Sequence, residues 1–387
     1  MTQRNTILAV AAAVVAVAGL VAGVRLQKGV PAEGQAGEAP TPPTPPAPTR
    51  QTPQAPDAEA MNGTTNLQAY AAFARAADAA DPREQIRLYT RAVELDPKYM
   101  QAYYNRGNAH ADRGAHRDAI RDFTTAIGLD GKCAEAWCNR GCAYQDIGDL
   151  DAAIRDFSKA IALKPRDATY YLNRSDAHAR KKDYGASIAD CNRAIALTPD
   201  DADLYYNRGN ARYGQGDWAG AIRDYSLAIQ RNPIHALAYN NRGSARARQG
   251  DAAAALADYD KAIALNGDYV RAYANRAVIY FRQKRYAAAV KDMDRVVAQR
   301  PKNPSAYRFR ADIRACAGQW TQAVADYTEA ISHSPQHAGT YEKRAEALLR
   351  LKKYAEAQQD LASCREMGGR PDPDLVRLVE AGVQPNK

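Results

Sequence analysis

Cysteine and the local motifs of common enzymes are scarce in this chain. Only six cysteines occur among 387 residues, too few for a scaffold held together by disulfide bonds. The sequence contains no glycine-rich phosphate loop, no nucleophile elbow and no His-Glu-x-x-His helix, which are the patterns that indicate phosphate binding, acyl transfer and zinc hydrolysis. We therefore expect no catalytic residue, no cofactor and no small-molecule substrate.

Ligands for a metal ion are also sparse. Cys138 and Cys142 stand one helical turn apart, with Cys133 nearby, but no histidine stands at ligand spacing beside them, and a metal or redox centre needs more convergent ligands. The sequence therefore predicts no metal site.

Positive charge is concentrated in one segment. The formal net charge is +9, and residues 270–303 hold nine Lys or Arg against two Asp. Because the basic residues form one patch and are not spread along a groove with interleaved aromatic residues, nucleic acid is not the expected partner. The pattern predicts a patch for an anionic partner, formed by Arg271, Arg282, Lys284 and Arg285.

A long apolar run occurs only at the start of the chain. Residues 7–24 carry no charge, and as a helix they would span about 27 Å, close to the hydrocarbon thickness of a bilayer. Residues 1–30 are therefore expected to be a single membrane anchor, with the repeats in the periplasm if the organism is a Gram-negative bacterium. The alternative is a cleaved signal peptide and a soluble periplasmic protein. Residues 31–62 are rich in proline and predict a disordered linker.

A period of 34 residues begins at about Asn66. Eight arginines keep this spacing without an insertion, and an aromatic residue stands three positions before each of them: Arg106, Arg140, Arg174, Arg208, Arg242, Arg276, Arg310 and Arg344. Apolar residues at three- and four-residue spacing form two stretches in each period, which indicates two amphipathic helices. Glycines such as Gly148 and Gly216 suit the end of the first helix, and prolines such as Pro165 follow the second.

This pattern resembles the tetratricopeptide repeat. The family pattern is Trp-x2-Leu-Gly-x2-Tyr, then Ala-x3-Phe, then Pro, and it is matched by Trp137, Gly141, Tyr144, Ala153, Phe157 and Pro165. The resemblance implies an all-α fold, a right-handed superhelical solenoid of about nine helix–turn–helix repeats with a C-terminal capping helix. The expected array covers residues 66–371: a degenerate repeat at 66–99, then 100–133, 134–167, 168–201, 202–235, 236–269, 270–303, 304–337 and 338–371. Residues 372–387 are expected to form the capping helix and tail.

The chain departs from the family pattern at one position, where Arg replaces Leu in all eight clear repeats. An arginine between two helices needs a partner, and every clear repeat has Asp sixteen residues later, whereas the degenerate repeat lacks both. We therefore predict structural ion pairs inside each repeat. They include Arg140–Asp156, Arg174–Asp190, Arg208–Asp224 and Arg242–Asp258.

An asparagine precedes the arginine in six consecutive repeats: Asn105, Asn139, Asn173, Asn207, Asn241 and Asn275. In related families this position lines a concave groove, where an amide hydrogen-bonds the backbone of an extended peptide, because it offers both a donor and an acceptor. The resemblance therefore implies a peptide-binding row of asparagines and other proteins as partners.

Two functions remain open at this stage. The first is a non-enzymatic, membrane-tethered scaffold whose groove binds an extended segment of a partner protein. The alternative is a structural subunit or assembly factor of an envelope complex, in which positions such as Leu172, Leu237 and Phe281 pack against a folded partner or another copy.

Overall fold

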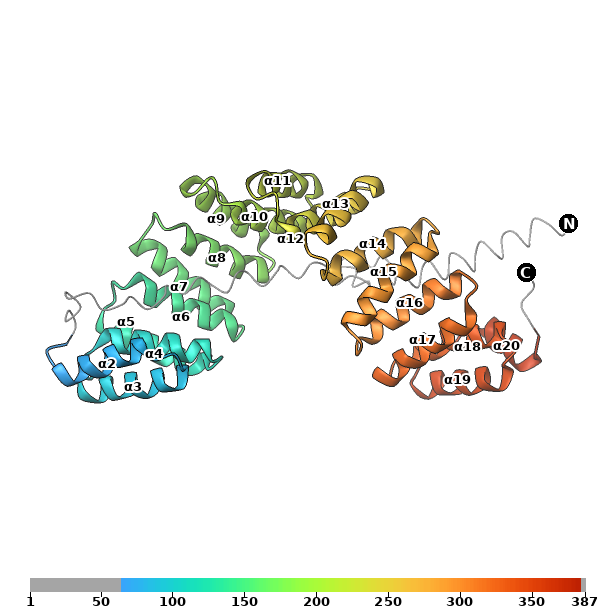
Figure 1. The fold of residues 1–387 in the computed structure, drawn as a ribbon, viewed down its shortest axis with the longest axis horizontal. Helices are drawn as coiled ribbons and strands as arrows, with labels where there is room; N and C mark the ends of the chain where they lie inside the picture. The colour runs from blue at the N-terminus through green and yellow to red at the C-terminus, as the bar shows by residue number, and fades with distance from the viewer. Residues whose placement is uncertain (1–63, 384–387) are drawn as a thin grey trace. The chain divides into compact units, whose positions relative to one another are not determined.

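The computed structural model describes residues 64–383, and every regular element within this range is an α-helix. The helices follow one another in packed pairs, one pair for each 34-residue repeat (Figure 1). The expected all-α solenoid is therefore confirmed. We call the two members of each pair the first helix and the second helix of the repeat.

The helices form two compact bodies, which we describe separately. The N-terminal body ends at Pro233, and the C-terminal body begins at Ile234. The N-terminal body contains, in chain order, α2 (Leu67–Asp78), α3 (Pro82–Leu95), α4 (Met100–Asp112), α5 (His116–Leu129), α6 (Ala134–Asp146), α7 (Leu150–Leu163), α8 (Ala168–Arg180), α9 (Tyr184–Leu197), α10 (Ala202–Gln215) and α11 (Trp218–Arg231).

The C-terminal body continues the same alternation and ends with one additional helix. It contains α12 (Ala236–Arg248), α13 (Ala252–Leu265), α14 (Val270–Arg282), α15 (Tyr286–Gln299), α16 (Pro304–Cys316), α17 (Trp320–His333), α18 (Ala338–Arg350), α19 (Tyr354–Glu366) and α20 (Pro373–Ala381). Val379 of α20 is buried against Leu348 and Leu361 of the last repeat, so α20 covers an apolar face that the array would otherwise expose.

The predicted membrane localisation is not supported by the structure. Among residues 64–383, no helix is long and apolar enough to cross a membrane. The apolar run at residues 7–24 and the linker at residues 31–62 lie outside the described residues.

The turn between the first and second helices has two recurrent devices. Glycine adopts a positive φ at the end of the first helix, for example 84° at Gly148, because a residue without Cβ enters the left-handed region without strain. The following Asp149 caps α7 by accepting a hydrogen bond from the N–H of Ala152 at 3.0 Å. Three repeats have lysine at the glycine position, with φ values between 60° and 63°: Lys182, Lys284 and Lys352.

The side chains that meet between the two helices of a repeat are complementary in size. In four repeats a glycine of the first helix faces an aromatic ring of the second: Gly107 and Phe123, Gly141 and Phe157, Gly209 and Tyr225, Gly243 and Tyr259. In three repeats a Ser or Ala stands opposite a smaller side chain at the same positions: Ser175 and Cys191, Ala277 and Met293, Ala345 and Leu361. Ala311 with Tyr327 is the exception, and the Tyr327 hydroxyl donates to Asp312 Oδ1 at 2.7 Å.

This size matching predicts the outcome of one substitution. A Cβ on Gly141 would stand 2.8 Å from Cε1 of Phe157, so Gly141→Ala is expected to lower the free energy of unfolding by about 1–3 kcal/mol. Adding Phe157→Leu should recover part of the loss, because the Ala–Leu combination already occurs at Ala345 and Leu361.

Gly128→Ala is the matched control for that measurement. Gly128 lies in α5, and a Cβ there meets no atom within 4 Å. This change should raise helix stability by up to about 1 kcal/mol. Both would be measured by urea denaturation of the full chain. A Gly141→Ala protein as stable as the parent would contradict the size matching.

The left-handed lysines predict a stabilising substitution. Lys182→Gly removes the unfavourable contact of Cβ with the backbone at φ 63°, which is expected to raise the free energy of unfolding by about 1 kcal/mol. Lys182→Ala deletes the same side chain but keeps Cβ, and should give no such gain. Thermal and urea denaturation of both variants would check this, and equal behaviour of the two would refute the role of strain.

Candidate functional site

An arginine–aspartate pair joins the two helices of each clear repeat. In all eight repeats Nε and Nη2 of the arginine donate to the two carboxylate oxygens of the aspartate sixteen residues later, at 2.7–3.0 Å. This is the bidentate geometry in which guanidinium and carboxylate bind most strongly. The pairs are Arg106–Asp122, Arg140–Asp156, Arg174–Asp190, Arg208–Asp224, Arg242–Asp258, Arg276–Asp292, Arg310–Asp326 and Arg344–Asp360.

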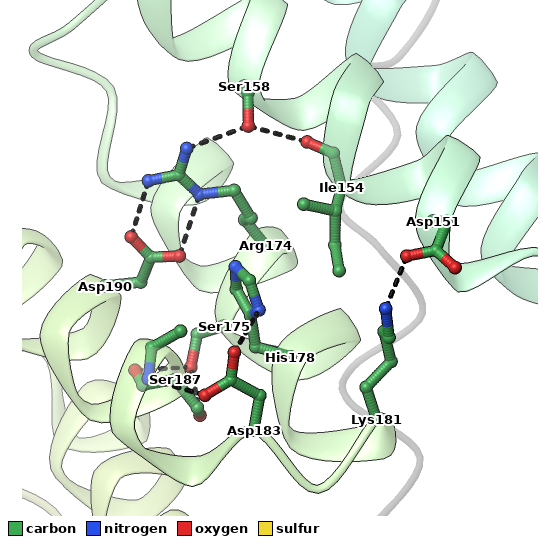
Figure 2. A network of polar contacts seen from close by, with 11 residues as sticks. Asp151, Ile154, Ser158, Arg174, Ser175, His178, Lys181, Asp183, Ser187 and Asp190 are labelled. Atoms are coloured by element: carbon green, nitrogen blue, oxygen red, sulfur yellow. Dashed lines mark hydrogen bonds and ion pairs between the residues drawn. The ribbon is translucent and has the colours of Figure 1, made fainter.

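The third nitrogen of the guanidinium contacts the preceding repeat. In Figure 2, Arg174 binds Asp190 of α9 and also Ser158 of α7, whose hydroxyl in turn donates to the carbonyl of Ile154. The Nη1 atom makes the equivalent bond in six more repeats, each time to a residue sixteen positions earlier: Thr90, Thr124, Asn192, Asp260, Asp294 and Thr328, at 2.5–3.1 Å. Sequence reasoning missed this contact, although a small polar or acidic residue stands at that spacing in the sequence.

An aromatic ring covers each of these guanidinium groups. The guanidinium carbon Cζ lies 4.8–6.0 Å from the centroid of the ring three residues earlier, in all eight repeats. The hydroxyl of Tyr205 donates to the carbonyl of Pro199 at 3.0 Å, and the indole N–H of Trp137 donates to that of Gly131 at 3.0 Å. The ring therefore binds the cation by its face and the preceding loop by its polar edge.

Some repeats add a second cation to the buried aspartate. Arg212 lies 2.9 Å from Asp224 and also belongs to the first helix. Arg246 and Arg314 occupy the same position in their repeats, at 2.8 and 2.7 Å from their aspartates. In repeat 100–133 the position holds His110, whose pKa is lowered by burial, so this imidazole is mostly uncharged at neutral pH.

We call the eight arginine–aspartate pairs the ladder, and a double-mutant cycle on Arg140 and Asp156 tests its contribution to stability. Each single change to Leu leaves one buried charge without its partner, which is expected to cost about 3–5 kcal/mol, whereas the double change removes both charges and should cost less than the sum. Arg208→Leu should cost less than Arg140→Leu, because Arg212 still binds Asp224.

The measurement is urea unfolding, analysed with the nearest-neighbour description of repeat arrays. Strictly additive losses at Arg140 and Asp156 would show that the two residues do not stabilise the fold as a pair.

The six asparagines do not share one environment. Three of them donate from Nδ2 to the first helix of the preceding repeat. Asn139 binds Asn108 Oδ1 at 2.8 Å and the Tyr104 hydroxyl at 3.1 Å. Asn275 binds Asn240 Oδ1 at 3.0 Å. The third is Asn173, which donates to two cysteine sulfurs of α6.

Asn173 is half-buried, and its Nδ2 lies 3.2 Å from Cys138 Sγ and 3.8 Å from Cys142 Sγ. Asn207 is also half-buried, and it donates to the carbonyl of Asp203 in its own helix at 2.8 Å. By contrast, Asn105, Asn139 and Asn241 are only 6%, 4% and 1% exposed. The predicted row therefore contains asparagines that hold repeats together and asparagines that retain accessible surface.

The predicted basic patch is divided by the structure. Arg271 lies in the first turn of α14, whereas Arg282 ends this helix and Lys284 and Arg285 follow it in the turn. Twelve helical residues place the two groups roughly 16 Å apart along the axis. Arg285 lies over the Tyr280 ring at 4.4 Å. Arg271 therefore does not belong to the same cluster as the other three.

The remaining polar residues of residues 64–383 do not form a metal centre. No group of three or more His, Cys, Asp or Glu in this range is arranged to hold a metal ion. None of the six cysteines forms a disulfide bond in the described residues, and burial raises the pKa of Cys191 to about 12, so this thiol is protonated and unreactive at neutral pH.

The comparison with family models identifies the repeat. A tetratricopeptide repeat model matches residues 70–132, 138–202, 246–304 and 310–365, and a second tetratricopeptide repeat model matches residues 175–239. Because these matches span more than half of the chain, it belongs to the tetratricopeptide repeat family, whose members generally act as non-enzymatic scaffolds for protein–protein interaction. The comparison with curated proteins found no match.

Several solved structures are similar to this chain. The crystal structure of the APC/C hetero-tetramer Cut9–Hcn1 is 16% identical, covers 74% of this chain and 56% of that chain, and has a TM-score of 0.51. The crystal structure of MamA is 28% identical over 42% of this chain and 94% of that chain, with a TM-score of 0.40. The crystal structure of YrrB, described as a TPR protein with an unusual peptide-binding site, is 22% identical over 48% of this chain and 95% of that chain, with a TM-score of 0.41. The first of these supports the fold.

Proposed function

We propose that this protein is a scaffold that binds an extended segment of a partner protein on the face formed by the first helices of its N-terminal body. The family supplies the general role of protein interaction. The single observation that carries the finer proposal is the set of amide groups on these helices whose hydrogen-bonding capacity is not fully used within the described residues.

Successive first helices lie against one another in this body. α4 contacts α6, α6 contacts α8, and α8 contacts α10. The residues that these first helices present on the same side therefore form a continuous surface, which we call the first-helix face. It carries Asn173 and Asn207 in consecutive repeats, both half-buried. Because sulfur is a weak acceptor and Asp203 belongs to the same helix as Asn207, neither amide is committed to a strong bond with the neighbouring repeat.

Two further amides on this face have an unused polar atom. Asn108 Nδ2 in α4 and Gln145 Oε1 in α6 are buried and have no hydrogen-bond partner within residues 64–383. The first is a donor and the second an acceptor. A peptide group offers the complementary acceptor and donor whatever side chain it carries, and a buried polar group without a partner costs about 1–3 kcal/mol. Because both atoms are buried, an extended segment on the first-helix face would meet the accessible amides of Asn173 and Asn207 first, and would reach Asn108 Nδ2 and Gln145 Oε1 only where neighbouring side chains move aside.

Asn139 has a different role in this proposal. Its Nδ2 joins α6 to α4 through Asn108 and Tyr104, and its side chain is almost fully buried. Asn139→Ala would leave the buried Oδ1 of Asn108 without its donor, so this change should reduce folding stability. A binding test therefore uses Asn173 and Asn207 and leaves Asn139 intact.

The experiment starts from a random peptide library selected against the full chain. The affinity of a selected peptide is measured for the parent and for the Asn173→Ala, Asn207→Ala double variant. Two lost hydrogen bonds of about 0.5–1.5 kcal/mol each predict a weakening of roughly fivefold to 150-fold. Asn266→Ala is the matched control, because Asn266 is an exposed amide in the loop before α14, and it should bind like the parent.

Changes in the peptide test whether the main chain is recognised. N-methylation of single peptide groups removes one donor each and should weaken binding more than alanine substitution of most side chains. Circular dichroism melting must show that the double variant folds. A folded double variant with parental affinity would refute the role of the two asparagines. A peptide that tolerates N-methylation throughout would refute main-chain recognition.

A further inference from the structure

We propose that the solvent face of α15 (Tyr286–Gln299), with the turns on either side of it, binds an acidic segment of a partner protein. We call this surface the α15 stripe. It consists of Lys284 and Arg285 before the helix, Lys291 and Arg295 one turn apart within it, and Arg300 and Lys302 after it. This site is on a second helix of the C-terminal body, so it does not depend on the function proposed for the first-helix face.

The six cations of the stripe are exposed and unneutralised. All six side chains are exposed, whereas Ala289, Met293 and Val296 on the opposite face of α15 are buried. Throughout residues 64–383, no ion pair joins any of the six to a carboxylate. The positive charge is therefore available to a partner.

The carboxylates of the same repeat are already used elsewhere. Residues 270–303 contain two aspartates. Asp292 is bound by Arg276 of the ladder at 2.7 Å. Asp294 binds Arg310 of the next repeat at 2.8 Å and Arg314 at 3.5 Å. Because ladder arginines bind both aspartates, the cations of the stripe have no carboxylate partner within their own repeat.

The turn before α15 carries two cations where other repeats have glycine and a capping aspartate. Lys284 has a φ of 60° at the position where Gly216 stands in repeat 202–235. Arg285 is the N-cap and makes no side-chain cap hydrogen bond, whereas Asp217 caps α11. A cation at a helix N-terminus is also unfavourable toward the helix dipole. At this turn, Lys284 therefore stands in place of glycine and Arg285 in place of a capping aspartate. Both positions carry a cation instead of the residue that would stabilise the turn.

The dimensions of the stripe favour a single acidic chain. One helix is about 10–12 Å wide with its side chains, and fourteen residues extend about 21 Å, which matches six or seven residues of extended peptide. The neighbouring repeats, 236–269 and 304–337, each carry equal numbers of acidic and basic residues, and Asp268 and Glu329 are exposed there. A nucleic-acid duplex or a membrane presents a broader anionic surface, which these carboxylates would repel.

The test uses a fluorescently labelled peptide of eight glutamates and the full-length protein. Binding is expected at low ionic strength and should weaken steeply as salt is added. Lys291→Glu with Arg295→Glu should weaken binding at least about tenfold, since each reversal removes an attraction and adds a repulsion. Arg155→Glu with Lys159→Glu is the matched control. These exposed residues hold the same positions in α7, and the change in net charge is identical.

A second variant separates binding from stability. Lys284→Gly with Arg285→Asp restores the usual turn, so it should raise the melting temperature while weakening octaglutamate binding. If the cations of the stripe served only the fold, this variant would bind octaglutamate like the parent. The Asn173→Ala, Asn207→Ala variant should bind octaglutamate like the parent, which keeps the two proposals distinguishable.

Three outcomes would overturn the proposal. The first is an equal loss in the α7 control, which would mean that only net charge matters. The second is absence of binding to octaglutamate at low ionic strength. The third is tighter binding of an eight-nucleotide oligothymidylate, a DNA duplex or vesicles with anionic lipid, lost in the same α15 variant, which would assign the stripe to nucleic acid or membrane.

Discussion

The guanidinium group of the repeated arginine holds three helices together. Nε and Nη2 bind the aspartate of the same repeat, and Nη1 binds the second helix of the preceding repeat, as Arg174 does with Asp190 and Ser158. The planar group has a fixed donor geometry, so these bonds specify how neighbouring helices are oriented. Desolvation offsets much of the attraction in a buried ion pair. We therefore expect the ladder to contribute more to the arrangement of the repeats than to their total stability.

This arrangement also determines what the first helices can offer a ligand. Stacking the repeats brings α6, α8 and α10 of the N-terminal body each against the first helix before it, and an amide next to the ladder arginine then meets the preceding helix. Asn139 makes such a contact, because its Nδ2 donates to Asn108 Oδ1. Where the preceding helix presents the thiols of Cys138 and Cys142, the amide of Asn173 is bound only weakly. The chemistry of the first-helix face is thus set by the residues of the preceding repeat.

The periodic features of the fold could be predicted from the sequence, and the contacts between repeats could not. The 34-residue spacing predicts helix pairs, and the joint loss of Arg and Asp in the degenerate repeat indicates a pair within each repeat. The bond from Arg140 to Thr124 was missed because it depends on how two repeats stack, which spacing along one repeat does not specify. The same limitation explains Asn139, which the family resemblance assigns to a peptide-binding row although it contacts the preceding repeat. The membrane localisation was wrong because it rested on composition near the N-terminus, and no spanning helix occurs within residues 64–383.

The ladder does not involve the exposed positions of the second helices, so these positions can differ in sequence from one repeat to the next. Asp292 and Met293 are buried between the helices of their repeat, whereas Lys291 and Arg295 contact no other element through an ion pair in the described chain. Substitutions at such positions change the surface without disturbing the bonds that orient the helices, because exposed charges contribute little to stability. The two aspartates of this repeat are held by ladder arginines, so added cations are not neutralised locally. A strongly charged surface can therefore arise on one repeat of an otherwise balanced array, while its fold stays that of its neighbours.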